Sequence, residues 1–391
     1  MTNSTMLVLV GGRSAVPTIS GIIQFLADIS RIKFLVCEGD EYENLQRITA
    51  DFIKGQKRDI DFNVERDVRV VNPNDFTKVL KTLSELVTEE KIAFASLASA
   101  PQTMSIASYA FLARKFKSDV MMFTVSTDHA AIIPLVENMS PIPFKQKLCV
   151  EDYVVACGQE IYKRKVEDSF IFQDINKLQK LSSLFIDNIE SVDSILAEIR
   201  KQVGGGDSIK SIRRIFLSNE DILRRNIAKP FLLDFLEELA SSDLIEKVEN
   251  SDIISFRMNP DQFDFLRGDW LELFVYLHSL KCGFDSVEVA IELANFNGEI
   301  DLFCLNNSNA LICECKTGKW DKKAILKLRN LAEKLGGSYC TKVLVTSAVE
   351  VPDEIIQEAK NSKVRIISGR ELSQITDILK DEMNEPMYGR R

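Results

Sequence analysis

Short apolar runs alternate with amphipathic segments over the first 125 residues of the chain. The apolar runs predict strands over residues 5–10, 32–37, 68–72, 92–98 and 119–125. Apolar residues at helical spacing predict helices near residues 15–29, 41–54, 75–90 and 102–116. Strands and helices that alternate in this way indicate βαβ units, so we expect a parallel, Rossmann-like sheet. Ligands of such sheets bind at the carboxyl ends of the strands.

The middle of the chain has a different pattern. A helical stretch near residues 174–202 precedes three consecutive glycines, which indicate a flexible joint. Two helices and a hairpin are then predicted over residues 209–258, with Ser218 as a helix cap and a turn at 250–252. This is the order of a winged-helix element. Such an element can bind DNA, but it is at least as often a packing or dimerisation module.

The last part of the chain is predicted to be a further α/β unit. A helix over 268–280 precedes two strands over 298–305 and 310–316, joined by the turn "NNSN". A helix over 322–337 that ends in two glycines, two more strands and a helix near 353–361 follow. We therefore expect a Rossmann-like domain (1–165), a helical linker (166–208), a winged-helix-like element (209–258) and an α/β domain (259–391).

Composition narrows the chemistry that this chain can perform. No run of about 18 apolar residues is present, and the start "MTNSTMLVLVGG" is typical of a first strand rather than a signal peptide. Eight cysteines without CxxC pairs suggest reduced, buried thiols in a cytoplasmic protein. With only His129 and His278, histidine-based triads and zinc sites are poorly supplied. An enzyme would have to rely on carboxylates, lysine and a hard metal ion.

The stretch "ALICECKTGKW" places charged residues inside an otherwise apolar strand. If pairing across the turn is regular, Leu305 faces Ala310 and Asp301 faces Glu314. Lys316 lies on the same face as Glu314, because side chains alternate along a strand. Two facing carboxylates repel each other unless a positive group lies between them. That group could be Lys316 in a structural ion cluster, or Mg²⁺ or Mn²⁺ in a phosphodiester hydrolysis site.

The order of Asp, hairpin, Glu-x-Lys and helix resembles the PD-(D/E)XK nuclease superfamily, in which an acid from the preceding helix often joins the site. The segments "GDWLE" (268–272), "NGEID" (297–301), "CECKTG" (313–318) and "LRNLAEKLGG" (328–337) resemble the DUF1887-type nucleases fused to a CARF domain more closely. These are ancillary CRISPR effectors that a cyclic oligoadenylate activates. The resemblance extends over the whole chain, from the CARF domain to a restriction-endonuclease-like C-terminal domain.

The resemblance implies a role for each part of the chain. The N-terminal domain would sense a cyclic oligoadenylate, most often the tetra-adenylate, across a homodimer. The C-terminal domain would be a metal-dependent nuclease for single-stranded RNA, DNA or both. Glu272, Asp301 and Glu314 match its Mg²⁺ or Mn²⁺ ligands, and Lys316 matches its catalytic lysine.

Two loops are candidates for the sensor site. Gly11 and Gly12 allow close backbone approach to a phosphate and Arg13 can pair with it, although a tight strand-to-helix turn explains this loop about as well. The second loop, "SLASAPQTM" (96–104), takes the place of a family segment with which it shares Met104 but not the two glycines or the lysine. The candidate ligand-binding residues are Gly11, Gly12, Arg13, Ser14, Ser99, Ala100, Pro101, Gln102 and Thr103.

Basic residues concentrate in two segments although the net charge is −9. Residues 200–229 hold eight Lys or Arg against three acids, and residues 316–334 hold seven against two. We expect the second segment to contact nucleic acid through Lys322, Lys323, Lys327 and Arg329, although solvated helix faces explain such runs as well. Two other functions stay open: a constitutive restriction- or repair-type nuclease, and a winged-helix regulator with an inactive nuclease fold.

Overall fold

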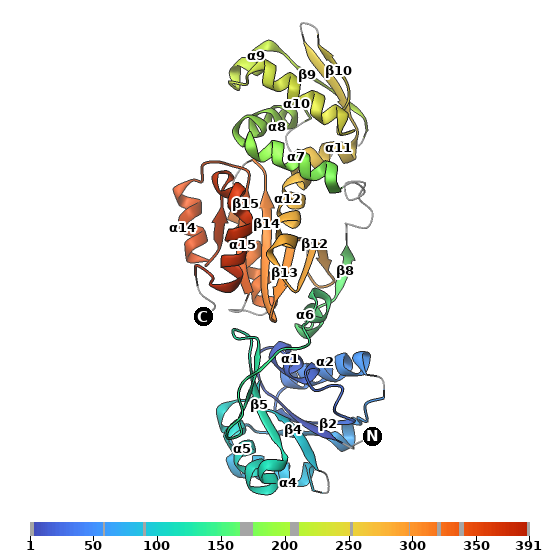
Figure 1. Ribbon diagram of the computed structural model, residues 1–391, viewed down its shortest axis with the longest axis vertical. Helices are drawn as coiled ribbons and strands as arrows, with labels where there is room; N and C mark the ends of the chain where they lie inside the picture. Colours follow the sequence, from blue (N-terminus) through green and yellow to red (C-terminus); the bar gives the residue numbers. More distant parts are fainter. Residues whose placement is uncertain are drawn as a thin grey trace.

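The computed structural model describes residues 4–57, 59–88, 91–164, 175–203, 211–250, 253–296, 298–318, 322–335 and 340–388. Three units are stacked along the long axis of the molecule (Figure 1). The N-terminal domain lies at one end and the winged-helix-like element at the other. The domain built mainly from the last third of the chain lies between them, in direct contact with both. None of the helices among the described residues has the length and apolar character that crossing a membrane requires.

The N-terminal domain is a seven-stranded sheet in the order β3-β2-β1-β4-β5-β6-β7, with the first five strands parallel. Its strands are β1 (Thr5–Val10), β2 (Arg31–Cys37), β3 (Val68–Val71), β4 (Ile92–Ser96), β5 (Met121–Ser126), β6 (Ala131–Pro134) and β7 (Ile142–Pro143). Its helices are α1 (Val16–Ile23), α2 (Asp40–Gln56), α3 (Val64–Asp67), α4 (Phe76–Leu86) and α5 (Gln102–Phe116), with a 3₁₀ turn at Lys117–Asp119. The strand order reverses between β1 and β4, so a crevice is expected at the carboxyl ends of these two strands.

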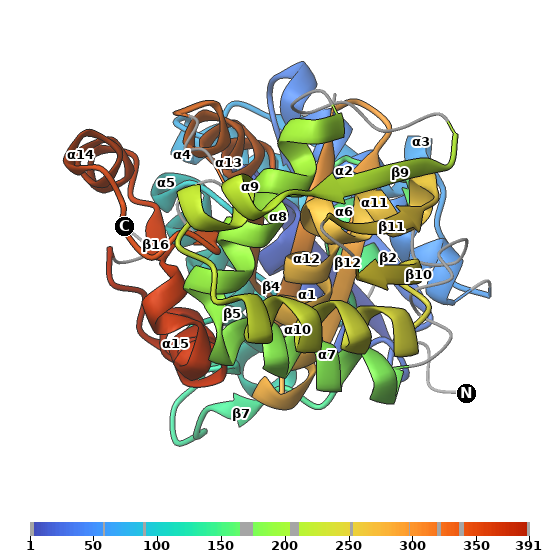
Figure 2. The same cartoon turned by 90° about the horizontal axis from the view of Figure 1, so that it is seen from above.

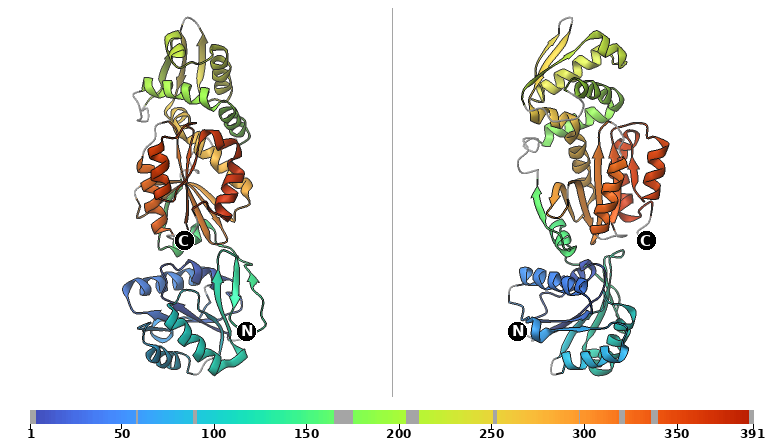
Figure 3. Two further views of the ribbon diagram at one scale, coloured as in Figure 1. Left: turned by 90° about the vertical axis from the view of Figure 1, so that its left-hand side faces the viewer. Right: turned by 180° about the vertical axis from the view of Figure 1, so that it is seen from behind.

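A six-stranded sheet in the order β16-β15-β14-β13-β12-β8 forms the central domain. Its strands are β8 (Ile161–Arg164), β12 (Ser286–Leu293), β13 (Glu299–Asn306), β14 (Asn309–Lys316), β15 (Cys340–Thr346) and β16 (Arg365–Ile367). One face packs against α12 (Trp270–Ser279) and α15 (Ile375–Asn384), and the other against α13 (Lys322–Lys334) and α14 (Asp353–Asn361). The two helical layers are visible on either side of the sheet in Figure 3.

The winged-helix-like element carries a three-stranded sheet in the order β10-β11-β9. It consists of β9 (Arg213–Leu217), α9 (Asn219–Arg224), α10 (Lys229–Ser241), β10 (Glu246–Asn250) and β11 (Ile254–Met258). Ser218 caps α9 in a reciprocal arrangement with Asp221, as its sequence predicts. The element rests on α7 (Ile175–Asp187) and α8 (Ile189–Val203) and on α11 (Pro260–Asp264), and it lies nearest the viewer in Figure 2.

The path of the chain differs from the serial order of domains that the sequence suggests. Segment 161–164, expected at the end of the N-terminal domain, is an edge strand of the central sheet, where it pairs with β12. The winged-helix-like element is therefore inserted between β8 and the rest of the central domain. Before β8, α6 (Val150–Ala156) packs against both the N-terminal and the central domain. This arrangement places the central domain against the loop that follows β1 and the loop that follows β4.

Most predicted elements are present, with shifted ends. β12 and α15 have no predicted counterpart, although Val287, Val289, Ile291 and Leu293 alternate along β12. The cysteines are all unpaired, but Cys149, Cys157 and Cys282 are not buried as predicted. The predicted glycine joint at 204–206, the turn at 251–252 and the glycine cap at 336–337 lie outside the described residues.

Candidate functional site

The hairpin of β13 and β14 forms the predicted framework of the site. Leu305 pairs with Ala310, and the turn is closed by two residues, Asn307 and Ser308, with φ angles of 52° and 64°. Two successive left-handed residues are typical of the tight turn that joins twisted antiparallel strands. The register therefore follows the sequence prediction and brings Asp301 toward Glu314.

The two strands separate where the acids lie. Backbone pairing, followed away from the turn, ends with Leu302 and Cys313. Asp301 and Glu314 are predicted to be the next pair, but their backbones do not pair. The carboxylate of Asp301 instead accepts a hydrogen bond from the backbone N–H of Cys315, with Oδ2 2.7 Å from the nitrogen. A side chain thus replaces the ladder hydrogen bond at this point.

Two lysines neutralise part of the charge of the acids. Lys316 Nζ lies 2.6 Å from one carboxylate oxygen of Glu314, and Lys327 Nζ donates to the other oxygen. Lys327 Nζ also lies 3.6 Å from Asp301 Oδ1. The Glu314 side chain is 3% exposed and that of Lys327 is 23% exposed, so this is a largely buried ion cluster. Lys327 therefore faces the acids. A contact with nucleic acid, as predicted for it, would need the ammonium to face solvent.

Lys327 is the member of the site that the sequence analysis assigned elsewhere. Ala324, Leu328 and Leu331 are buried on the face of α13 that contacts the sheet. Lys327 is three residues after Ala324 and four before Leu331, which is the spacing of that same face. A lysine on the apolar face of an amphipathic helix indicates a buried partner, and this pattern could have identified Lys327 from the sequence.

Glu272 approaches the cluster from the opposite face of the sheet. It lies on α12, directly after a π-helical turn at Phe265–Asp269, a feature that is frequent at functional sites. Burial raises its pKa well above the usual range, and the charge of Asp301 raises it further. Its neighbours Trp270 and Phe274 are buried.

The protonation of the other groups follows from burial and charge. Burial and the adjacent Glu314 carboxylate raise the pKa of Asp301 to about 6. Burial of Lys316 disfavours its charged form, but the carboxylates of Glu314 and Asp301 outweigh this and raise its pKa. Burial, and after it the neighbouring carboxylates, therefore favours the protonated forms of Asp301 and Glu272.

The donor atoms of the site fit a hard divalent cation. Carboxylate oxygens are the ligands that such cations prefer, and Asp301 and Glu314 present theirs to one partly buried site. In the described part of the chain, however, no three His, Cys, Asp or Glu side chains are grouped as ligands of one ion. The ammonium of Lys327 lies between two of the candidate ligands, Asp301 and Glu314.

A cleft of about 430 Å³ opens beside the acids. It is lined by Phe296, Glu314, Lys316, Lys323, Ala324, Leu326, Lys327 and Asn330. Lys322, Lys323 and Arg329 are exposed on α13, as a contact with nucleic acid requires. Lys322 and Arg329 also form ion pairs, with Glu354 and Glu333 respectively.

Arg200 lies near the site, and the sequence pattern gave no indication of this. It lies on α8, and its Nη1 donates to the backbone carbonyl of Arg267 and to Thr317 Oγ1 at 3.4 and 3.3 Å. Gly318 has a φ of 86°, and a Cβ at this position would be 3.2 Å from Arg200 Nη2. Thr317 and Gly318, which follow Lys316, are therefore fitted closely to Arg200.

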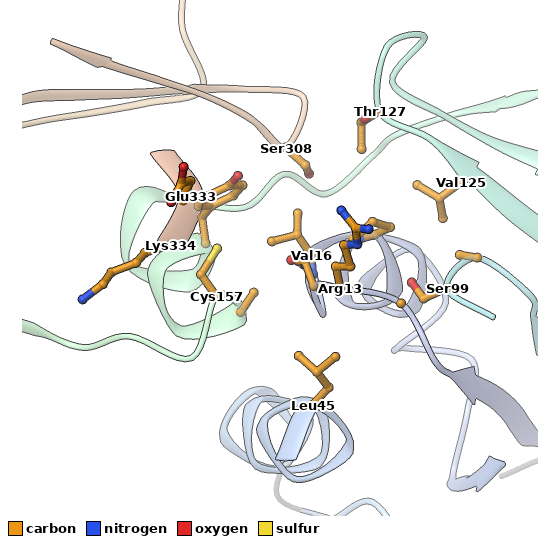
Figure 4. A pocket seen from close by; sticks show the side chains of 16 residues that line it. Arg13, Val16, Leu45, Ser99, Val125, Thr127, Cys157, Ser308, Glu333 and Lys334 are labelled. Atoms are coloured by element: carbon orange, nitrogen blue, oxygen red, sulfur yellow. Dashed lines mark hydrogen bonds between the residues drawn. The ribbon is translucent and has the colours of Figure 1, made fainter. Parts of the chain in front are cut away.

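A cavity of about 510 Å³ lies at the carboxyl ends of β1 and β4. Figure 4 shows Arg13 and Ser99 facing it from the N-terminal domain, with Ser308, Glu333 and Lys334 on the central-domain side. Of the nine predicted ligand-binding residues, four line it: Gly12, Arg13, Ser14 and Ser99. The position agrees with the predicted crevice, but the lining includes a second domain that the sequence did not suggest.

The other five predicted ligand-binding residues lie outside the cavity lining. A Cβ at Gly11 would lie 2.3 Å from Cys37 Sγ and 2.7 Å from Pro101 Cδ, so packing explains this glycine. Pro101 is the N-cap of α5, and Gln102 and Thr103 are in its first turn. With Ala100, these residues are not part of the cavity lining.

Residues 260–385 match the Card1-like endonuclease domain family. The whole fold is similar to that of protein VC1899 from Vibrio cholerae, with 16% identity over 99% of each chain and a TM-score of 0.75. It is also similar to Can2 from Sulfobacillus thermosulfidooxidans, solved with cyclic tetra-adenylate, with 16% identity over 98% of each chain and a TM-score of 0.69.

A type III CRISPR defence DNA nuclease activated by cyclic oligoadenylate is a more distant match. It is 15% identical, with 88% of this chain and 45% of that chain covered and a TM-score of 0.51. No curated protein sequence gives a significant match. At these identities the solved structures establish the fold, and the family match covers the domain that carries the acids. Residues 260–385 thus match a Card1-like endonuclease domain, and the whole chain has the fold seen in VC1899 and Can2.

Proposed function

We propose that this protein is a metal-dependent nuclease for single-stranded RNA or DNA, activated by a cyclic oligoadenylate in type III CRISPR defence. One observation carries the proposal. Within a Card1-like endonuclease domain, Asp301, Glu314 and Lys316 meet where two paired strands separate, beside an open cleft. The Can2 structure with cyclic tetra-adenylate and the cyclic oligoadenylate-activated nuclease support the choice of activator.

The chemistry assigned to the cleft is phosphodiester hydrolysis. Asp301, Glu314 and Glu272 are the residues that would hold Mg²⁺ or Mn²⁺, which when bound lowers the pKa of a water molecule. Lys316 is held by Glu314 at the edge of the cleft, where its ammonium can orient the attacking water and offset negative charge on the phosphate. These roles need no histidine.

Nucleic acid is proposed to bind along the exposed side of α13. Lys322, Lys323 and Arg329 form the basic track, without Lys327, whose ammonium is directed to the acids. Contacts of this kind are made to phosphates and not to base edges. Binding is therefore expected to be weakly sequence-selective and to weaken steeply as the salt concentration rises.

The cavity at β1 and β4 is the proposed sensor site. Its volume of about 510 Å³ is typical of a pocket for one small ligand. A ring of four nucleotides is larger than that, so we propose that two copies of the chain share one ring as a homodimer. Arg13, exposed at the cavity, is the proposed phosphate partner.

A single cleavage assay tests the proposed function. The protein is incubated with labelled single-stranded RNA, single-stranded DNA and supercoiled plasmid, in Mn²⁺ or EDTA. Each reaction is repeated with cyclic tri-, tetra- or hexa-adenylate. We expect cleavage that requires both the metal and one cyclic ligand. Cleavage that requires only the metal would instead identify a constitutive nuclease, and operator binding without cleavage would identify a winged-helix regulator.

A further inference from the structure

One helix, α13, lines both the acidic cleft and the sensor cavity. Lys323, Leu326 and Lys327 line the cleft, and Glu333 and Lys334, near the other end, line the cavity. The ammonium of Lys334 points away from the cavity (Figure 4) and donates to the carbonyl of Asn295 at 3.0 Å. Lys327 and Lys334 are seven residues apart, which is about two helical turns or ~10 Å along the same face. A shift of this helix would therefore be felt at both places.

Lys327 holds the position between Asp301 and Glu314 that a cation would occupy. Its ammonium contacts the carboxylates of both residues. A divalent cation held by the same two carboxylates would repel an ammonium a few ångströms away, and the repulsion is large in a partly buried site. Lys327 and a metal ion are thus competing partners of these two acids.

Three contacts lie at or beside the cavity end of α13, and the first of them joins the end of this helix to α6. Tyr153 Oη, from α6 at the cavity, donates to the carbonyl of Leu335 at 2.7 Å. The ammonium of Lys334 lies 5.3 Å from the ring centre of Phe296, which lines the acidic cleft. Next to α13, Ser20 Oγ of the N-terminal domain donates to Ser308 Oγ in the turn of the acidic hairpin at 2.8 Å.

We propose that Lys327 is a positioning residue that competes with the divalent cation for Asp301 and Glu314, and that α13 couples this competition to the sensor cavity. A ligand in the cavity moves Glu333 and Lys334, the helix follows, and Lys327 withdraws from the carboxylates. The acids then become free to bind metal. This inference rests on the proposed function, since it specifies how occupancy of the sensor reaches the nuclease site.

Metal binding measured without nucleic acid tests the competition. Mn²⁺ is titrated by calorimetry into the full-length wild-type protein, Lys327→Met and Lys327→Gln in the absence of cyclic nucleotide. Loss of a competing charged hydrogen bond predicts roughly 10- to 100-fold tighter Mn²⁺ binding by both variants. Lys322→Met, the same change on the same helix at a residue paired with Glu354, is the control and should leave Mn²⁺ affinity unchanged. Unchanged affinity in folded Lys327 variants would overturn the proposal.

Repeating the titration with cyclic tetra-adenylate tests the coupling. Ligand should tighten Mn²⁺ binding in the wild type and in Lys316→Met, but not in Lys327→Met. Metal should also tighten ligand binding in the wild type by the same factor. If the Mn²⁺ affinity of Lys327→Met responds to ligand as that of the wild type does, coupling through Lys327 is wrong.

The Lys316→Met variant separates competition from simple electrostatics. It removes an equal charge beside Glu314. If only total charge mattered, cyclic tetra-adenylate would change the Mn²⁺ affinity of Lys316→Met and Lys327→Met in the same way. The outcome is also separable from the proposed function. If the wild-type protein binds no cyclic adenylate, the proposed activation fails, yet the titrations without ligand still decide whether Lys327 competes with the metal.

Discussion

At the scale of single residues, the central feature of the site is that each carboxylate oxygen of Glu314 contacts a different lysine. One is held by Lys316, which faces the cleft, and the other by Lys327, which comes from the apolar face of α13. The two lysines have the same charge but different surroundings: the Lys316 side chain is 40% exposed and that of Lys327 is 23% exposed. We therefore assign the reaction to Lys316 and the control of the acids to Lys327.

Lys316→Ala should abolish nuclease activity. Its ammonium is the side-chain cation that we place next to the attacking water, so its loss should lower the cleavage rate by about 10²-fold or more. The rate is measured on a labelled single strand with Mn²⁺ and cyclic tetra-adenylate. Cyclic tetra-adenylate affinity, measured separately, should be unchanged, because Lys316 does not line the sensor cavity. A variant that cuts at the wild-type rate would remove Lys316 from the site.

Asp301→Asn should change how stability depends on pH when metal is removed with EDTA. The folded-state pKa of Asp301 is about 6, against an ordinary value of 3.8. Between these values the folded protein keeps a proton that the unfolded chain has released. Stability therefore falls as the pH rises through this range and stays lower above it.

Asparagine keeps an oxygen that can accept the N–H of Cys315 but has no proton to lose. The free energy of unfolding of Asp301→Asn minus that of the wild type should therefore be larger near pH 8 than near pH 5. The free energy of unfolding in urea at both pH values measures this difference. An equal difference at the two pH values would contradict the assigned pKa.

At the scale of elements, the pattern of polar and apolar residues predicts the hairpin register well. Leu305 and Ala310 pair as expected because the buried faces of both strands leave one register possible. The place where the strands separate could not be predicted, because it depends on the Asp301 side chain replacing a backbone acceptor. The role of Lys327 was equally inaccessible, since a helix pattern gives the face of a residue and not its partner.

Gly11→Ala tests whether this sensor-loop glycine is required for packing. An added Cβ would collide with Cys37 Sγ and Pro101 Cδ, so we expect a loss of roughly 1–3 kcal/mol in the free energy of unfolding. Gly55→Ala is the matched control. Nothing lies within 4 Å of an added Cβ near the end of α2, so it should stabilise the protein by roughly 0.5–1 kcal/mol. Denaturation followed by circular dichroism measures both; a neutral Gly11→Ala would contradict the packing role.

At the scale of the whole molecule, the order of units in space explains how sensing can reach the nuclease site. The sequence predicts the Rossmann-like, winged-helix and nuclease units, and the fold class is confirmed by the solved structures that match over nearly the full length. It does not predict that the winged-helix-like element is inserted into the nuclease domain, since that depends on β8 pairing with β12, far away in the chain. Because α6 and β8 join the central domain directly after the N-terminal one, the two domains meet at the proposed sensor cavity.

Arg13→Ala separates sensing from catalysis. Arg13 lines the cavity and lies in a different domain from the acidic cleft. Loss of a charge-assisted phosphate contact should weaken cyclic tetra-adenylate binding by roughly 10- to 100-fold. The concentration of ligand needed for half-maximal cleavage should rise by a similar factor, with an unchanged rate at saturation. A lower rate at saturation would contradict a role limited to sensing.

The most direct test of the account is the cleavage rate of a labelled single strand in Mn²⁺ as cyclic tetra-adenylate is titrated. We predict negligible cleavage without the ligand, a saturable rise with it, and no cleavage in EDTA or by Lys316→Ala at any ligand concentration. A wild-type rate that is the same with and without the cyclic ligand would contradict the claim that the sensor cavity controls the acidic site.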